Sequence, residues 1–205
     1  MKEKVSKLMV LGCTFLLASV LSAGGQGKVL MLLRVGDPGL IDVMLAKEVT
    51  VMKSALSASG FTVVIATTTG DEIKGSRTSL RPDAKVASIR LADYKGLIVP
   101  CMAAGGTPVP SEFVALVKQA AALGKPIAAQ NSAVEILGQA GVLKGRRFAI
   151  EQDLSAIVAG GTFAGIGVVQ DGKIVTSGTC PFMAQELGKP DGTGELTRKL
   201  IALMR

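Results

Sequence analysis

Three side chains that could do chemistry stand where predicted strands end: Cys101, Asn131 and Cys180. Histidine is absent from the chain. Neither a Ser-His nor a Cys-His catalytic pair can therefore form within it, and the commonest general base and zinc ligand is missing. We expect no metal site and no cofactor.

The stretch from Gly124 to Gly138 is the most informative. It predicts a short apolar strand over 126–130, a sharp turn at Asn131, and a helix with Ser132 near its N-cap. α/β enzymes often hold a nucleophile at such a turn. Asn tolerates a positive φ, but its amide is no ordinary nucleophile. Ser132 is expected to cap the helix, the alternative being a hydroxyl activated by a lysine.

The N-terminus has the order of a secretory signal peptide. Lys2, Lys4 and Lys7 precede an apolar run over 8–21, and small residues follow at 22–25. That run is short for a transmembrane helix, so an uncleaved anchor is the alternative. We assign residues 1–23 to the signal, with Cys13 inside it. The protein is then exported, to the periplasm or the medium, and touches the membrane only through this segment.

Composition favours one α/β domain over residues 28–205. Hydrophobic residues make up 48% of the chain and aromatic residues 3%, with 25 glycines. The net charge of +7 falls to +5 once the signal is removed, because 23 basic residues lose three and 16 acidic residues lose one. The remaining charges are scattered and have no interleaved aromatic residues, so we expect no nucleic-acid partner.

Apolar runs predict strands over 28–34, 61–66, 96–100 and 126–130, and helical spacing predicts helices over 42–59, 111–123 and about 192–204. Ser111 could cap the second helix. A hairpin is predicted around Asp171-Gly172. The strand-helix-strand order implies a parallel sheet with right-handed crossovers. The polar segment 67–93 predicts only short edge strands, and Asp37-Pro38-Gly39 is either a ligand loop or a plain turn.

Six segments together resemble the ThiJ/PfpI family: KVLMLL, SGFTVVIAT, DYKGLIVP, EFVALVKQAAALGKPIAA, AGVLKGRRFA and VVQDGKIVTSG. The resemblance implies a three-layer α/β sandwich with a mostly parallel central sheet, of the flavodoxin-like, class I glutamine-amidotransferase-like type. It also implies a homodimer. The family includes peptidase-like, deglycase, glyoxalase and chaperone members.

The resemblance places the family's nucleophilic cysteine on Asn131 and its histidine on Ser132. The family carboxylate that contacts the thiol falls on Leu45, and Glu48 matches a second acid one turn later. Asp42 could substitute only with a shift of register. Cys101 falls in a region that helps to form an oxyanion hole, and Cys180 follows the hairpin at the pocket border. Both cysteines should then border one cleft, as a disulfide, as inert core residues, or as reactive or metal-linked thiols.

Two functions follow. The first, which the replacement of the family's cysteine and histidine favours, is a non-catalytic or weakly catalytic domain, a pseudoenzyme with a role in stress responses. It would bind a small polar ligand or a partner through Asn131, Ser132, Cys101, Met102, Glu48 and Cys180. The alternative is a hydrolase, deglycase or glyoxalase-like enzyme that uses Cys101 as nucleophile, with Glu48 or a lysine as base.

Overall fold

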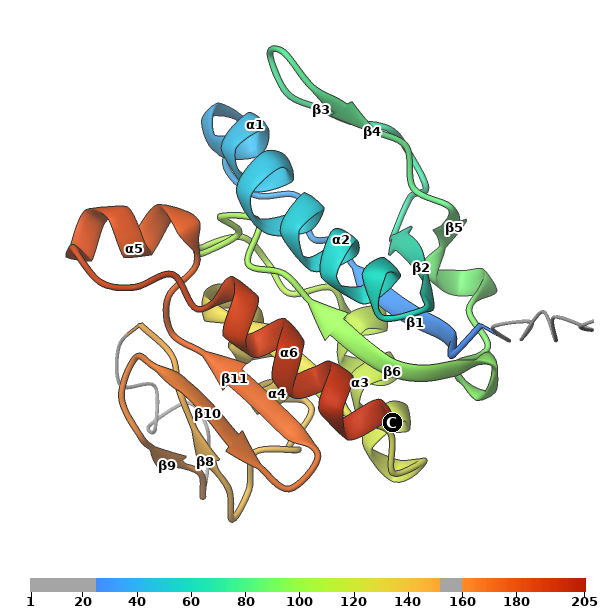
Figure 1. Ribbon diagram of the computed structural model, residues 1–205, viewed down its shortest axis with the longest axis vertical. Helices are drawn as coiled ribbons and strands as arrows, with labels where there is room; N and C mark the ends of the chain where they lie inside the picture. The colour runs from blue at the N-terminus through green and yellow to red at the C-terminus, as the bar shows by residue number, and fades with distance from the viewer. Residues whose placement is uncertain (1–24, 152–159) are drawn as a thin grey trace, which may run out of the picture.

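A seven-stranded sheet forms the centre of the computed structural model, which describes residues 25–151 and 160–205 (Figure 1). Its order is β10-β11-β7-β6-β1-β2-β5. Every neighbouring pair is parallel except β10 and β11, which form an antiparallel hairpin. The strands are β1 Gly27–Leu32, β2 Phe61–Thr67, β5 Ala84–Lys85, β6 Tyr94–Val99, β7 Ile127–Gln130, β10 Val168–Asp171 and β11 Ile174–Ser177.

Helices cover both faces of this sheet. On one face lie α1 Ile41–Met44, a π-helical turn Leu45–Val49, α2 Thr50–Ala58 and α6 Thr193–Met204. On the other lie α3 Ser111–Ala122 and α4 Val134–Gln139. A further helix, α5 Pro181–Leu187, follows β11. The expected three-layer α/β sandwich is therefore confirmed.

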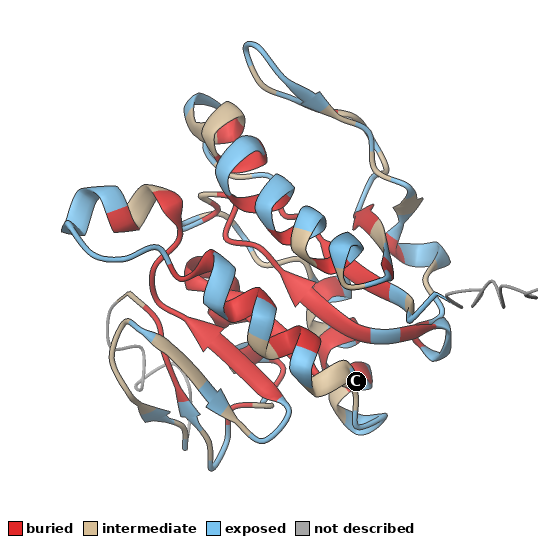
Figure 2. Cartoon of the chain, viewed as in Figure 1, coloured by how far each residue is buried: buried red, intermediate tan, exposed pale blue. Residues whose placement is uncertain are grey.

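Alternation along β1 explains the three layers. Leu30 and Leu32 pack into one apolar cluster with Phe113 of α3, whereas Val29 and Met31 pack into a second cluster with helices α2 and α6. Successive side chains of a strand point to opposite faces, so a strand buried on both sides must be apolar throughout. Figure 2 shows the central strands buried along most of their length.

The predicted strands and helices are confirmed to within a few residues, with three differences. The predicted 42–59 helix contains a π-helical turn at Leu45–Val49, and α5 was not expected. Ser111 does not cap α3: Pro110 holds the N-cap position, and the Ser111 hydroxyl contacts Glu112. Proline at N1 of α5 and the left-handed Gly188 at its C-terminal end are local signals for that helix.

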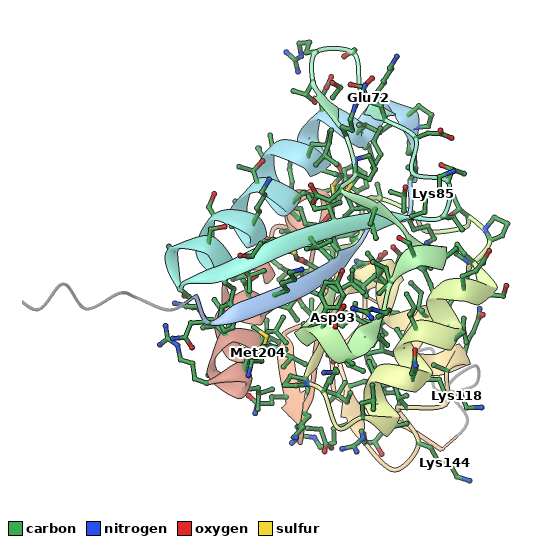
Figure 3. The ribbon with its side chains drawn as sticks, turned by 90° about the vertical axis from the view of Figure 1, so that its right-hand side faces the viewer. Glu72, Lys85, Asp93, Lys118, Lys144 and Met204 are labelled. Carbon is green, nitrogen blue, oxygen red and sulfur yellow. The ribbon has the colours of Figure 1, made fainter. Side chains whose placement is uncertain are left out.

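The polar segment between β2 and β6 contains short strands, as expected. β3 Ile73–Lys74 and β4 Ser79–Leu80 form a hairpin that projects from the body, with Glu72 beside it in Figure 3. The Asp42 carboxylate of α1 anchors the hairpin by accepting hydrogen bonds from the backbone N–H groups of Ser76, Arg77 and Thr78. A second small sheet pairs β8 Arg147–Phe148 with β9 Thr162–Phe163.

The predicted signal segment 1–23 lies outside the described residues. Within residues 25–151 and 160–205, no helix has the length and apolar character needed to cross a membrane.

Candidate functional site

A cavity lies beyond the carboxyl ends of β6, β7 and β11, where Cys101, Asn131 and Cys180 follow those strands. Parallel strands bring their carboxyl ends to the same edge of a sheet, where α/β proteins bind ligands. The cavity has a volume of about 260 Å³, and Ser132, Asp37 and Glu151 also line it. A second cavity of about 490 Å³ adjoins it through Asn131, Ser132 and Glu151. The expected convergence of both cysteines on one cleft is seen.

Asn131 makes the expected turn. Its φ is +47°, in the left-handed region, directly after β7. The side-chain Nδ2 donates to the carbonyl of Gly178 at 2.9 Å and to Oε2 of Glu151 at 3.3 Å. The amide thus occupies the position of a nucleophile, yet its contacts tie β7 to the chain that follows β11. Its chemistry here is hydrogen bonding.

Ser132 does not cap the following helix. A 3₁₀ turn over Asn131–Ala133 comes first, and α4 begins at Val134 with Ala133 at its N-cap. The turn carries the Ser132 hydroxyl toward Cys101: Oγ donates to the Cys101 carbonyl at 3.1 Å and lies 3.3 Å from Sγ. The expectation of an N-cap is therefore wrong, and Ser132 is instead a neighbour of the thiol.

The loop that carries Cys101 has unusual backbone geometry. Met102 and Ala103 have φ of +51° and +49°, a conformation that costs about 1–2 kcal/mol for each residue with a side chain. The Glu48 carboxylate holds the loop by accepting from the N–H of Cys101 at 2.8 Å and of Met102 at 2.9 Å. Gly36 packs closely against the same loop, because a Cβ at this position would clash with the backbone carbonyl of Ala103.

The predicted pocket residues Glu48 and Met102 do not line the cavity. Met102 is buried in the apolar cluster beneath the loop, and Glu48 is fully buried behind it. Leu45, onto which the resemblance places the family carboxylate, also packs in that cluster. Glu48 is thus the carboxylate near the thiol. The π-helical turn contains both residues, and such turns are frequent at functional sites.

The electrostatics of Glu48 follow from its burial. Burial raises the pKa of Glu48 well above its ordinary value, and the neighbouring Cys101 raises it further. The two backbone N–H groups oppose this rise but do not cancel it. The protonated form of Glu48 is therefore favoured beside a Cys101 thiolate.

The Cys101 thiol is acidified. The pKa of Cys101 falls to about 6, chiefly because the Cys180 thiol donates a hydrogen bond to it, with help from the hydroxyl and N–H of Ser132 and the N–H of Ala103. These donors outweigh the burial that would raise the pKa. The pKa of Cys180 is raised by the same contact and by burial. Both cysteines are free thiols in the structure, not a disulfide.

Sequence reasoning missed Arg34 and Glu151. Arg34 is 5% exposed and follows β1; its guanidinium donates to the carbonyls of Thr107 and Ser132, both at 3.2 Å. Desolvation lowers the pKa of Arg34, while Glu135 and Cys101 raise it. In the sequence, the only signal for Arg34 is that a charged residue ends the apolar run of the first strand. Glu151 gives no sequence signal, because it reaches the cavity from a connecting segment.

The cavity walls are acidic. Asp37 and Glu151 line the smaller cavity, and Glu135 and Glu151 line the larger; none of the described residues that line either cavity is a lysine or an arginine. The rest of the chain carries an excess of positive charge. Within residues 25–151 and 160–205, no group of three or more His, Cys, Asp or Glu side chains could hold a metal ion.

Comparison with known proteins agrees with this architecture. The chain is 34% identical over 121 residues to an uncharacterized protein of Archaeoglobus fulgidus, covering 54% of this chain and 69% of that protein. Similar solved structures include a ThiJ/PfpI domain protein from Brachyspira murdochii, with a TM-score of 0.66 and 14% identity over 88% of this chain and 98% of that one. Another is DJ-1beta of Drosophila melanogaster, with a TM-score of 0.61 and 21% identity over 86% of this chain and 96% of that one.

These structural likenesses are below 25% identity and concern the fold. The sequence profile of the DJ-1/PfpI family matches residues 40–187, which include Glu48, Cys101, Asn131 and Cys180. The chain belongs to the DJ-1/PfpI family.

Proposed function

We propose that this DJ-1/PfpI domain is a cysteine-dependent enzyme for small electrophiles, with the Cys101 thiolate as nucleophile. The observation that carries the proposal is the thiol itself: Cys101 lines a cavity, lies 3.3 Å from the Ser132 hydroxyl, and has its pKa lowered to about 6. A thiolate, not a thiol, is the reactive form of cysteine. At neutral pH the greater part of Cys101 would be in that form.

The surroundings of Cys101 suit an addition reaction. The thiolate sulfur attacks the electron-poor carbon of a carbonyl compound, a C–S bond forms, and the carbonyl π electrons move to oxygen. The Ser132 hydroxyl, 3.3 Å from the sulfur, can rotate from the Cys101 carbonyl to donate its one hydrogen bond to that oxygen. A proton from solvent then completes a hemithioacetal. No histidine is needed for this step, because Cys101 is ionised before the substrate arrives.

With a dicarbonyl substrate, the hydrogen on the hemithioacetal carbon then moves to the neighbouring carbonyl carbon, which gives the thioester of a hydroxy acid. Water hydrolyses this thioester, the C–S bond breaks, and the hydroxy acid and the Cys101 thiol are released.

Charge and size restrict the substrate class. A cavity of about 260 Å³ admits a molecule of a few carbon atoms. Asp37 and Glu151 on its walls repel carboxylates and phosphates, so we assign neutral or positively charged carbonyl compounds to it. Methylglyoxal, a neutral dicarbonyl, is a suitable first probe.

The rival function is a non-catalytic domain that binds a small polar ligand at Asn131. It is favoured by one observation: the Asn131 amide lies in both cavities and presents hydrogen-bonding groups there in place of a nucleophile. In this function Cys101 lines the pocket and forms no covalent bond with the ligand.

Two variants separate the functions. Cys101→Ser should abolish methylglyoxal consumption, while Asn131→Gly should retain it, because glycine adopts the φ of +47° without strain. Consumption is followed by the loss of the dicarbonyl and the appearance of a hydroxy acid. If the wild type shows neither turnover nor a covalent adduct on Cys101, the enzyme proposal fails. Binding of a neutral polar ligand that Asn131→Gly abolishes would then support the rival.

We also propose that the protein is exported through residues 1–23 and forms a homodimer. The basic, apolar and small-residue order of the N-terminus supports export. Mass spectrometry of protein from the periplasm or medium would test cleavage near Ala23. Light scattering of the mature chain would test the dimer, and a monomer mass would overturn it.

A further inference from the structure

The addition chemistry proposed for Cys101 uses Cys180 only to acidify the Cys101 thiol and not as a reacting group. Cys180 comes from a separate part of the chain, between β11 and α5, and is fully buried. It lines the same cavity as Cys101 and packs in the same buried cluster, and it is the largest cause of the lowered pKa of Cys101. Two free thiols that line one small cavity are the components of a dithiol reaction.

We propose that Cys101 and Cys180 form a redox-active pair that reduces small hydroperoxides, with Cys101 attacking the peroxide and Cys180 resolving the oxidised product. The inference rests on the nucleophilic Cys101 of the proposed function and adds a role for Cys180. Its substrate class is a hydroperoxide, and its second substrate is an external thiol that restores the reduced pair.

The reaction balances in two steps. First, the Cys101 thiolate attacks the terminal oxygen of ROOH: an S–O bond forms, the O–O bond breaks, and the leaving alkoxide takes a proton to give ROH. Cys101 is now a sulfenic acid. Second, the Cys180 sulfur attacks the Cys101 sulfur, the S–O bond breaks, and the hydroxide leaves as water with the Cys180 proton. The peroxide has been reduced by two electrons, and the two thiols have become a disulfide.

The contacts assign the roles in this order. The thiolate-stabilising donors, Ser132 and Ala103, belong to Cys101. Cys180 stays protonated because the adjacent Cys101 raises its pKa. Once Cys101 is an uncharged sulfenic acid, its charge no longer raises that pKa, and Cys180 can ionise and attack. The first step thereby prepares the second.

The cavity also sets the peroxide class. Cys101 is 4% exposed and Cys180 is fully buried, so the oxidant must enter the cavity. Asp37 and Glu151 disfavour anionic hydroperoxides such as those of fatty acids. Hydrogen peroxide is small and neutral and is the probe of choice.

In the test, the full mature chain is reduced and then treated with one equivalent of hydrogen peroxide in an oxygen-free buffer that contains dimedone, a reagent that traps sulfenic acids. The products are identified by mass spectrometry and peptide mapping. The wild type should lose two hydrogens and yield a Cys101–Cys180 linked peptide. Cys180→Ser should instead give one dimedone adduct on Cys101, and Cys101→Ser should give neither product. With dithiothreitol present, peroxide consumption should be catalytic in the wild type and at least about tenfold slower in Cys101→Ser, a difference of about 1.4 kcal/mol in barrier.

The outcomes separate this inference from the proposed function. If the wild type forms no linked peptide but iodoacetamide still alkylates Cys101 rapidly near pH 7, the redox pair is wrong, and Cys101 remains supported as a nucleophile. If Cys101 reacts with neither hydrogen peroxide nor iodoacetamide, both the redox pair and the proposed function fail. Circular dichroism checks that each variant folds. The linked peptide of the wild type decides the case even if Cys180→Ser does not fold.

Discussion

Replacing Cys180 by alanine tests the central physical claim, which is that one thiol acidifies the other. The Cys180 thiol is the largest cause of the lowered pKa of Cys101. Alanine removes that donor, whereas serine keeps a donor of similar size. We therefore expect the pKa of Cys101 to rise in Cys180→Ala and to stay near 6 in Cys180→Ser.

The size of the rise can be worked from the contact. A hydrogen bond to a charged group contributes about 1.5–3 kcal/mol. A thiol is a weak donor, so the lower end applies, and about 1.4 kcal/mol corresponds to about one pKa unit. At pH 6 the thiolate fraction of Cys101 would fall from about one half to about one tenth, a fivefold loss.

Iodoacetamide alkylation measures this change. Rate constants for Cys101 are collected from pH 5 to pH 9 with peptide mapping to confirm the site, and the inflection gives the pKa. At pH 6 the alanine variant should react about twofold more slowly, because the fivefold loss of thiolate is partly offset by an about threefold gain in nucleophilicity. At pH 9 it should react about threefold faster, because a more basic thiolate is a better nucleophile. The Cys101→Ser variant is the blank.

An inflection for Cys180→Ala at or below that of the wild type would refute the reasoning. So would identical pH profiles for the alanine and serine variants, since only serine keeps a donor. Either result would assign the acidity of Cys101 to Ser132 and Ala103 alone.

The remaining predictions concern stability and the hairpin. Glu48→Gln should lose about 1–3 kcal/mol in urea unfolding, because a buried N–H of the Cys101 loop loses its acceptor; an unchanged midpoint would argue against that contact. Folding lowers the pKa of Cys101 from about 9 to about 6. The ionisation of Cys101 therefore adds to the free energy of unfolding fully above pH 9, and this contribution is lost as the pH falls to 6. The stability of the wild type relative to Cys101→Ser, measured in reductant, should therefore decrease over that range, and a constant difference would contradict it. Asp42→Ala should make the 73–80 hairpin sensitive to protease without changing Cys101 alkylation, and unaltered cleavage would show that the anchor is dispensable.

The sequence alone predicted the layers of the fold, for a clear reason. Strands buried on both faces must be apolar throughout, and helices that cover a sheet must repeat their apolar residues with helical spacing. Both patterns are local and can be read from single segments. The turn at Asn131 was predicted in the same way, because a left-handed residue after an apolar strand favours Asn.

The site was only partly accessible from the sequence. That Cys101, Asn131 and Cys180 follow strand ends was visible, and the parallel sheet places such ends together. The resemblance placed the family carboxylate that contacts the thiol on Leu45, whereas Glu48 holds that place in the fold. The π-helical turn that contains both residues was not predicted. Ser132 was assigned to a helix cap, because the 3₁₀ turn that redirects its hydroxyl to Cys101 has no sequence signal.

The chemistry of the site was decided by tertiary structure alone. The sequence established that no histidine is present and that two cysteines lie outside the predicted signal. Whether Cys101 is acidic depends on donors from Cys180 and Ser132, which come from distant parts of the chain. A pKa responds to the charges, hydrogen bonds and burial within a few ångströms of a group. Those neighbours are fixed by the folded sheet, and no local pattern of residues encodes them.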